Sequence, residues 1–293
     1  MPEIPVTSER PAAAQPRDFA SAEALLQRTF SGISHLHATP AARAFIAAHW
    51  NRYVRILSKL PPLEPGAPVL EVGASIVASA LKTGLGADMH VAFHELETEW
   101  AARFAAEGIK GSPVELLRDE LPYAPGTFAV ILFDEVMEHF PLAPDFFVAR
   151  LIRLLRPGGQ LILSVPNFAT WEKRFALLRG RNPQDHMDPR FVYYAHHREP
   201  VMAECEDLAR RCGGIVRERE WTDYGPQASA ARTAWNLLRY LRHLEFHKIA
   251  HVLFPAMRSY LFLRIERDPA GREMTLPPPP LAGSPEFAPR AAS

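Results

Sequence analysis

The chain has 293 residues, of which 47% are hydrophobic and 23% charged, the ordinary composition of a globular protein with a sizeable core. Its 33 basic and 33 acidic residues balance, so no overall field attracts nucleic acid, and we expect no nucleic-acid partner. The two cysteines, Cys205 and Cys212, lie in one predicted helix and indicate free thiols in a reducing compartment. Without a signal peptide or a bilayer-spanning apolar run, the sequence predicts a cytoplasmic protein.

The two ends of the chain differ in composition from the middle. Residues 1–20 are rich in proline and alanine, and residues 268–293 contain four consecutive prolines. Such segments lack the apolar residues that a packed core needs, so both are predicted to be disordered. We assign residues 21–267 to a single domain.

Predicted helices and strands alternate through this domain. Helices are expected at 21–29 and 40–59, with Thr39 as N-cap and Pro40 at the first helical position. Strands are predicted at 67–72, 89–95, 112–117, 128–133, 160–166, 214–220 and 259–267. Further helices are predicted after Gly73 and at 98–108, 144–159 and 199–212. This order predicts an α/β fold whose sheet is mostly parallel, with an antiparallel strand at the end.

The first strand ends in "VLEVGASIVASAL", which suggests a ligand-binding turn. Ligands of open α/β sheets bind beyond the carboxyl ends of the strands, and Gly73 lies there. Glu95, at the end of the second strand, could bind the hydroxyls of a ribose. A dinucleotide site needs more glycines than Gly73, and Glu71 would repel a pyrophosphate, so the turn favours a cationic amino-acid ligand.

Four stretches resemble the class I S-adenosylmethionine-dependent methyltransferases: "VLEVGAS", "HEL", "RDELPYAPGTFAVILFDEVMEHF" and "LRPGGQLILSVPN". The resemblance covers about residues 40–220 and implies a Rossmann-like seven-stranded sheet with helices on both faces and S-adenosylmethionine as cofactor. It implies that the methionine part of the cofactor contacts Glu71, Gly73, Ala74 and Ser75. The ribose would contact Glu95, and the adenine would contact Leu96 and either Asp119 or Glu120. Phe133 and Asp134 would close the pocket.

The turn also departs from that family, whose members commonly carry glycine at the positions of Ser75 and Val77. A β-branched residue such as Val77 restricts the backbone to negative φ. Two interpretations follow: a reshaped loop that still binds the cofactor, or a degenerate domain that serves as a scaffold.

Glu135, Glu138 and His139 follow the fourth strand with helical spacing. If this turn is helical, the three side chains share one face, where Glu138 and His139 could assist catalysis and His139 could deprotonate a hydroxyl. The set resembles a metal-binding trio of quinone-biosynthesis O-methyltransferases. Alternatively, the side chains only bind neighbouring loops, and we expect no metal.

Two insertions, at about 168–198 and 225–258, are predicted on the acceptor side of the sheet. The first contains His197, a further candidate for the catalytic base. It also contains "HHRE", a stretch that resembles methyltransferases of polysaccharide and glycolipid assembly and implies O-methylation of a small-molecule or lipid-linked glycan acceptor. A quinone or phenol is the alternative acceptor. Residues 232–258 are basic and amphipathic, which suggests either peripheral contact with a membrane or a solvated lid.

Overall fold

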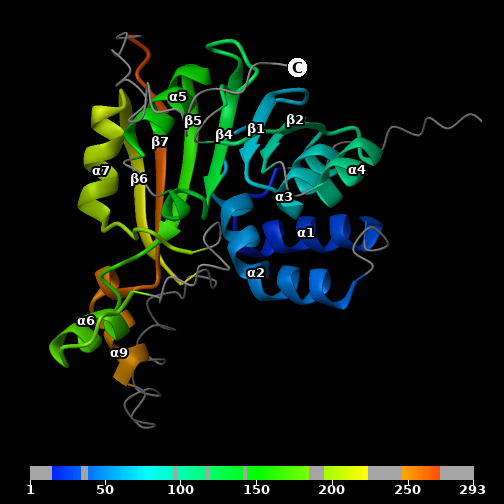
Figure 1. The fold of residues 1–293 in the computed structure, drawn as a ribbon. Coiled ribbons are helices and arrows are strands. Elements are labelled where there is room, and N and C mark those ends of the chain that lie inside the picture. Colours follow the sequence, from blue (N-terminus) through cyan, green and yellow to red (C-terminus); the bar gives the residue numbers. More distant parts are fainter. Residues whose placement is uncertain are drawn as a thin grey trace, which may run out of the picture.

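The computed structural model describes residues 15–33, 39–94, 98–116, 119–140, 144–184, 195–223 and 246–270. A seven-stranded sheet with the order β3-β2-β1-β4-β5-β7-β6 forms its centre (Figure 1). The strands are β1 (Pro68–Val72), β2 (Asp88–Phe93), β3 (Lys110–Pro113), β4 (Phe128–Asp134), β5 (Leu155–Pro166), β6 (Gly214–Thr222) and β7 (Tyr260–Arg267). The larger helices are α1 (Phe19–Ile33), α2 (Pro40–Ser58), α4 (Thr98–Ala106), α5 (Asp145–Leu154), α6 (Trp171–Leu178), α7 (Met202–Arg211) and α9 (Phe246–Leu253).

Strand direction agrees with the sequence-based prediction. β1 pairs with β2 and β4 in parallel, as do β2 with β3 and β4 with β5. β7 runs antiparallel to both β5 and β6. The predicted mixed sheet, with an antiparallel last strand and helices on both faces, is confirmed.

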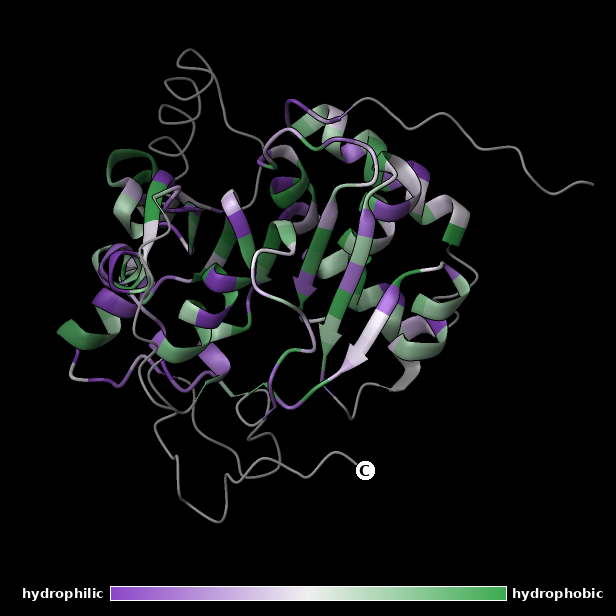
Figure 2. Ribbon diagram, turned by 90° about the horizontal axis from the view of Figure 1, so that it is seen from above, coloured by the Kyte–Doolittle hydropathy of each residue, from purple (hydrophilic) through white to green (hydrophobic). Residues whose placement is uncertain are grey.

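The central strand β4 shows why the sheet is covered on both sides. Ile131 and Phe133 pack into the cluster that includes residues of α5 and α7. Val130 and Leu132 point the opposite way, into the cluster formed with α1, α2 and α4. Successive side chains of a strand face opposite sides, so a continuous apolar run requires helices on each. Figure 2 shows helices with mixed hydropathy flanking the more hydrophobic strands.

The N-terminal helices follow the predicted capping pattern. The Thr39 side chain accepts a hydrogen bond from the backbone N of Ala42 at 3.1 Å, with a proline at the start of α2. However, α1 begins at Phe19, and the Gln15 side-chain amide donates to the carbonyl oxygen of Pro61 at 2.6 Å. Ordered structure therefore begins before residue 21. Residues 1–14 and 271–293 lie outside the described residues, and the remaining domain limits stay predictions.

Two predicted elements differ in extent. β3 covers Lys110–Pro113, not 112–117, because its pairing partners are the residues of β2 from His90 to Phe93. The helix expected over 144–159 ends at Leu154, and the chain passes directly into β5, where Leu155 pairs with Phe128. Gly158 adopts φ +72°, which only glycine adopts readily, and a register shift between β4 and β5 accompanies it.

Both insertions are anchored at the carboxyl edge of β5. The Asn167 side-chain amide donates to the carbonyl oxygens of Ala256 and Arg258 at 3.0 and 2.7 Å. Asp223, just after β6, accepts hydrogen bonds from the backbone and hydroxyl of Ser259 at 2.9 Å. α6 and α9 lie beside each other below this edge (Figure 1). Residues 185–194 and 224–245 of the insertions lie outside the described residues.

Both cysteines are buried and free, which confirms the predicted thiols. Burial raises the pKa of each thiol to about 12, so neither is a nucleophile near neutral pH. None of the described helices has the length and apolar character required to cross a membrane.

The aromatic packing beneath β4 provides a test of the fold. Phe147 of α5 is fully buried, with its ring centroid 5.6 Å from that of Phe133 and 5.2 Å from that of Phe140. Phe147→Ala should lower the free energy of unfolding by about 3–5 kcal/mol in urea titrations, because it leaves a cavity. Phe45→Ala is the control, since Phe45 is 51% exposed. Its effect should stay within about 0.5 kcal/mol, and similar losses for both variants would contradict this packing.

Candidate active site

Gly73 forms the turn at the end of β1. Its φ is +89°, and its backbone N donates to the carbonyl oxygen of Ala92 in β2 at 2.8 Å. A Cβ on this residue would lie only 3.0 Å from Cγ2 of Val136, which follows β4. Both the backbone conformation and the close approach of the β4 turn therefore require glycine here.

Ser75 gives the glycine-poor turn its shape. Its hydroxyl accepts a hydrogen bond from the backbone N of Val77 at 3.0 Å and donates to Oε1 of Glu71 at 2.5 Å. Ser75 is thus the N-cap of α3 (Ile76–Ser79), and Val77 is buried within that helix. Helical residues have negative φ, so the branched side chain of Val77 fits without strain. Ala74 packs against the same side of the sheet.

Glu71 is a buried acid, 4% exposed, immediately before this turn. Burial raises its pKa to about 7, while the Ser75 hydrogen bond opposes the rise and the charge of Asp134 adds to it. Its second oxygen, Oε2, is buried without a hydrogen-bond partner among the described residues. That oxygen is available to a hydrogen-bond donor or cation that reaches the turn.

Asp134 ends the neighbouring strand, β4, and faces the helix α2. Its Oδ2 lies 3.2 Å from Nε of Arg52, whereas its Oδ1 is buried without a hydrogen-bond partner in the described part of the chain. Burial raises the pKa of Asp134, and Arg52 opposes the rise. Next to Arg52, Tyr53 is 1% exposed, and burial raises its pKa to about 12.

Sequence reasoning missed Arg52 and Tyr53. The one available signal was their place on an amphipathic helix. Tyr53 shares the buried face of α2 with Ile46 and Ile56, and Arg52 stands beside it. A cation at the margin of a buried face requires an acidic partner, but the sequence alone does not identify that partner as Asp134.

Five other predicted cofactor residues belong to the core, to a loop or to a part of the chain that is not described. Phe133 is fully buried, and its ring packs against Phe147 of α5. Asp119 accepts a hydrogen bond from the backbone N of Glu115 at 2.8 Å, within its own loop. The side chain of Glu120 is 89% exposed, and its Oε1 lies 3.6 Å from Arg150. Glu95 and Leu96 are outside the described residues.

The turn after β4 does not carry its acids on one helical face. Glu135 has φ +54°, a left-handed conformation, and its Oε1 accepts a hydrogen bond from the hydroxyl of Ser164 at 3.2 Å. Only Met137–His139 form a helical turn, the 3-10 helix η3. The positive φ ends strand β4 and the turn is helical only from Met137, so the condition under which the three side chains would share one helical face is not met.

Glu138 and His139 meet a third side chain, His196, from the first insertion. Glu138 is 1% exposed, and its Oε1 lies 3.9 Å from Nε2 of His139 and 4.0 Å from Nε2 of His196. Burial raises the pKa of Glu138 well above its ordinary value, with a further contribution from Glu135. Burial and the nearby His196 lower the pKa of His139 to about 4, so this ring is neutral at pH 7.

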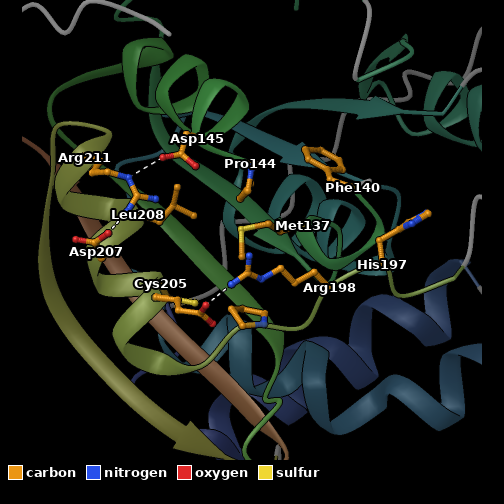
Figure 3. Close-up of a pocket in the computed structure, with 12 residues that line it drawn as sticks. Met137, Phe140, Pro144, Asp145, His197, Arg198, Cys205, Asp207, Leu208 and Arg211 are labelled. Atoms are coloured by element: carbon orange, nitrogen blue, oxygen red, sulfur yellow. Dashed lines mark hydrogen bonds and ion pairs between the residues drawn. The ribbon is translucent and has the colours of Figure 1, made fainter. Parts of the chain in front are cut away.

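A cavity of about 620 Å³ adjoins this cluster. His197 and Met137, the chain neighbours of His196 and Glu138, are part of its wall, and Figure 3 shows that it lies between η3, the start of α5, and α7. Arg211 pairs there with Asp145 at 2.7 Å. The cavity lining does not include Glu71 or Gly73.

Comparisons with known proteins identify the family and the fold. The family model described as "Methyltransferase domain" matches residues 45–204, more than half of the chain, and the chain belongs to this family. The search of curated proteins gave no match. The predicted class of protein is thereby confirmed at the level of the family.

Similar solved structures share the fold. Phosphoethanolamine N-methyltransferase 2 of Haemonchus contortus, with phosphomonomethylethanolamine and S-adenosylhomocysteine, has a TM-score of 0.52 and 14% identity over 84% of this chain and 60% of that chain. Its complex with S-adenosyl-L-methionine has a TM-score of 0.48 and 15% identity over 75% of this chain and 53% of that chain. The chain thus matches less than two thirds of these proteins. A Haloferax volcanii methyltransferase, in complex with the activator Trm112, has a TM-score of 0.52 and 16% identity. The match covers 86% of this chain and 99% of that chain.

The raised pKa of Glu71 predicts how pH affects stability. The folded state holds the proton up to about pH 7, whereas the unfolded state releases it near 4.5. Stability from this group is therefore fully present below pH 4.5 and is lost as the pH rises through 7, by up to about 3 kcal/mol. Glu71→Gln carries no titrating proton and should flatten this decline.

Urea unfolding at pH 5, 6, 7 and 8 measures the difference between the wild type and Glu71→Gln. Glu120→Gln, which replaces a side chain that is 89% exposed, is the control and should follow the wild type. Parallel curves for the wild type and Glu71→Gln would contradict the buried, protonatable state of Glu71.

Proposed function

We propose that the protein transfers the methyl group of S-adenosylmethionine to an acceptor hydroxyl. One observation carries the proposal: the buried oxygens Oε2 of Glu71 and Oδ1 of Asp134, which have no hydrogen-bond partner among the described residues, end two adjacent parallel strands beside Gly73. S-adenosylmethionine carries an ammonium and a sulfonium group, and buried carboxylates favour cations. The residues present therefore fit this cofactor.

Each residue of this site has a distinct proposed part. Gly73 lets the backbone approach the ligand, Glu71 accepts from its ammonium group, and Ser75 holds the Glu71 carboxylate in place. Asp134, fixed by Arg52, supplies the second acceptor. The bound cofactor supplies an already activated methyl group, so positioning accounts for much of the rate.

For the adenosine part of the cofactor, we retain the residues proposed from the sequence: Glu95 would bind the ribose, and Leu96 would lie beside the adenine. For the adenine amino group, the carboxylate of Asp119 is already engaged by Glu115, and Glu120 extends into solvent. A change in the loop around residues 115–120 would have to accompany binding if either carboxylate contacts the adenine. We propose that Phe133 supports the site from the core, where it is buried.

The acceptor proton needs a base, and His197 suits this part better than His139. His197 lines the cavity beside the cluster, where an acceptor could lie. The pKa of His139, lowered to about 4, makes it a weak base at neutral pH. Glu138 is covered by the backbone N–H groups of His197 and Arg198, which donate to its carbonyl oxygen at 2.8 and 3.3 Å, and it supports the site from below.

For the acceptor we propose a sugar hydroxyl of a lipid-linked glycan, reached from a membrane surface by a cytoplasmic protein. The supporting feature is the tip of α6 and α9, defined by the exposed apolar side chains Phe175, Leu177, Leu178, Leu253 and Phe254. Exposed arginines surround α6, among them Arg174, Arg179 and Arg181. Exposed apolar groups with basic neighbours are typical of surfaces that lie on anionic membranes.

Two alternatives remain from the sequence. A quinone or phenolic acceptor would also fit a cavity beside a histidine, but it gives no role to the exposed tip of α6 and α9. A scaffold without activity was suggested by Ser75 and Val77. Ser75 caps α3 and holds Glu71, and Val77 fits the helix, so this feature no longer favours the scaffold.

Calorimetry with S-adenosylhomocysteine tests the cofactor site. The wild type should bind it, and Glu71→Ala and Asp134→Asn should each weaken binding about tenfold or more, the effect of losing a hydrogen bond to a charged group. Glu120→Gln should bind like the wild type. Absence of binding by the wild type would support the scaffold alternative, and binding of NAD instead would overturn the proposed reaction.

Cosedimentation with vesicles of anionic phospholipid tests the membrane surface. Leu178 is 84% exposed at the tip, and Leu178→Glu should lower the partition coefficient about tenfold, since a buried leucine contributes about 1.5–3 kcal/mol. Phe45→Glu, at an exposed position on α2, is the matched control and should partition like the wild type. If the wild-type protein stays in the supernatant, the proposed membrane contact is wrong.

A further inference from the structure

The cluster of Glu138, His139 and His196 has the composition of a metal site. One carboxylate oxygen and two imidazole nitrogens converge, with all three ligand atoms within 4.8 Å of one another. We propose that these residues bind a divalent transition-metal ion. The proposal concerns metal binding itself and does not depend on the acceptor.

The buried carboxylate of Glu138 is the first independent support. Its side chain is fully buried, and both oxygens lack a hydrogen-bond partner among the described residues. A buried carboxylate is stabilised by a proton or a cation, because an unpaired buried charge costs several kcal/mol. Both oxygens of Glu138 are therefore open to a metal ion that enters between it and the two imidazoles.

The second support is the orientation of the two imidazoles. Nδ1 of His139 lies 3.2 Å from the carbonyl oxygen of Ala195, which can only accept a hydrogen bond. In the neutral ring Nδ1 therefore carries the proton, and the lone pair is on Nε2, the atom that faces Glu138. His196 repeats the pattern, because its Nδ1 lies 2.9 Å from Oε1 of Glu199 and its Nε2 faces Glu138.

These outer contacts resemble those that support histidine ligands in metal sites. Such a histidine donates its other N–H to a carboxylate or a backbone carbonyl, which fixes its tautomer and orientation. Here Ala195 supplies the carbonyl and Glu199 the carboxylate. Lys173 of α6 pairs with Glu199, which places a positive charge beside this carboxylate.

Size and donor type limit which ion fits. The Nε2 atoms of His139 and His196 lie 3.9 and 4.0 Å from Oε1 of Glu138. Bonds of about 2.1 Å to a single ion bring neighbouring ligand atoms to about 3–3.4 Å, so the side chains must move inward by roughly half an ångström. Two imidazoles and one carboxylate suit Zn²⁺, Fe²⁺ or Mn²⁺, and three protein ligands leave a position open for another oxygen.

The cluster of Glu138, His139 and His196 differs from the trio of Glu135, Glu138 and His139 that the sequence suggested. For that trio we expected no metal. The left-handed φ of Glu135 turns its carboxylate to Ser164, and His196 takes the third place. His196 reaches Glu138 because the segment after Ala195 is fastened to η3, with the backbone N of His197 donating to the carbonyl oxygen of Glu138. Two segments far apart in the chain thus build the cluster.

The coordination position left open by the three protein ligands would allow the ion to take part in the reaction, a role that rests on the proposed function. An acceptor hydroxyl bound there would release its proton more easily, because the metal polarises the oxygen. His139 would then serve as a ligand, and His197, outside the cluster but in the wall of the adjoining cavity, would receive the proton.

Metal binding is measured on full-length protein treated with a chelator and dialysed, without any methyl donor. Titration with Zn²⁺ and with Mn²⁺ in a calorimeter should give one bound equivalent for at least one ion. At a hundredfold excess over the dissociation constant, that ion should raise the melting temperature by about 5 °C. The absence of a bound equivalent for both ions, with Co²⁺ also failing to give visible ligand-field absorption, would overturn the proposal.

Three variants locate the ion. Glu138→Gln and His196→Gln should each weaken binding about a hundredfold or more and abolish the melting shift, whereas His90→Gln should bind like the wild type. His90 is the matched control, because its Nε2 also lies near a carboxylate, 3.4 Å from Asp88, but no second imidazole joins that pair in the described structure. Unchanged binding by Glu138→Gln would place the ion elsewhere and overturn the proposal.

Stability without metal separates a ligand role from a structural one. Metal-free Glu138→Gln should melt no lower than the metal-free wild type, because neither oxygen of Glu138 has a hydrogen-bond partner among the described residues that the substitution would remove. If Glu138 only stabilised the fold, the metal-free variant would melt at a lower temperature than the metal-free wild type. His196→Gln, at a side chain that is 31% exposed, keeps the test valid if Glu138→Gln fails to fold. Calorimetry with S-adenosylhomocysteine reports separately on the cofactor site, so either proposal can fail alone.

Discussion

Burial of three carboxylates at one edge of the sheet is the constraint on which the site depends. The strand order places β1 beside β4, so that Glu71, Asp134 and Glu138 come together away from water. A carboxylate moved out of water is destabilised unless a proton or a cation compensates its charge. Burial raises the pKa of all three carboxyl groups, and Arg52, paired with Asp134, opposes the rise there.

The backbone at Glu135 divides this acidic region in two. A left-handed conformation of a residue other than glycine costs about 1–3 kcal/mol, and the hydrogen bonds of Glu135 to Ser164 help to hold it. Before this residue, Asp134 faces α2 and the turn of Gly73. After it, Glu138 faces the histidines of the first insertion. One strained residue therefore lets a single strand end serve two neighbouring sites, one suited to a cationic organic ligand and one to a metal ion.

The sequence predicts the features that local chemistry determines. The continuous apolar run of β4 required two covered faces, and the turn at Gly73 required a residue without a side chain; both were readable from the residues themselves. The partners of the buried acids were not readable, because Arg52 lies about eighty residues before Asp134 and His196 lies far after Glu138 in the chain. The helical spacing of Glu135, Glu138 and His139 was misleading for another reason: a positive φ interrupts the helix, and no local pattern announces it.

The first insertion links the proposed membrane surface to the proposed metal site. α6 carries exposed apolar side chains at its end and, one turn earlier, Lys173. Lys173 pairs with Glu199, Glu199 accepts from His196, and His196 faces Glu138. The His196–Glu199 contact is at hydrogen-bond distance, 2.9 Å, so a shift of α6 would change the position of the Glu199 carboxylate and with it the orientation of the His196 ring. A lipid surface that fixes α6 would thereby favour the arrangement in which the three ligand atoms converge.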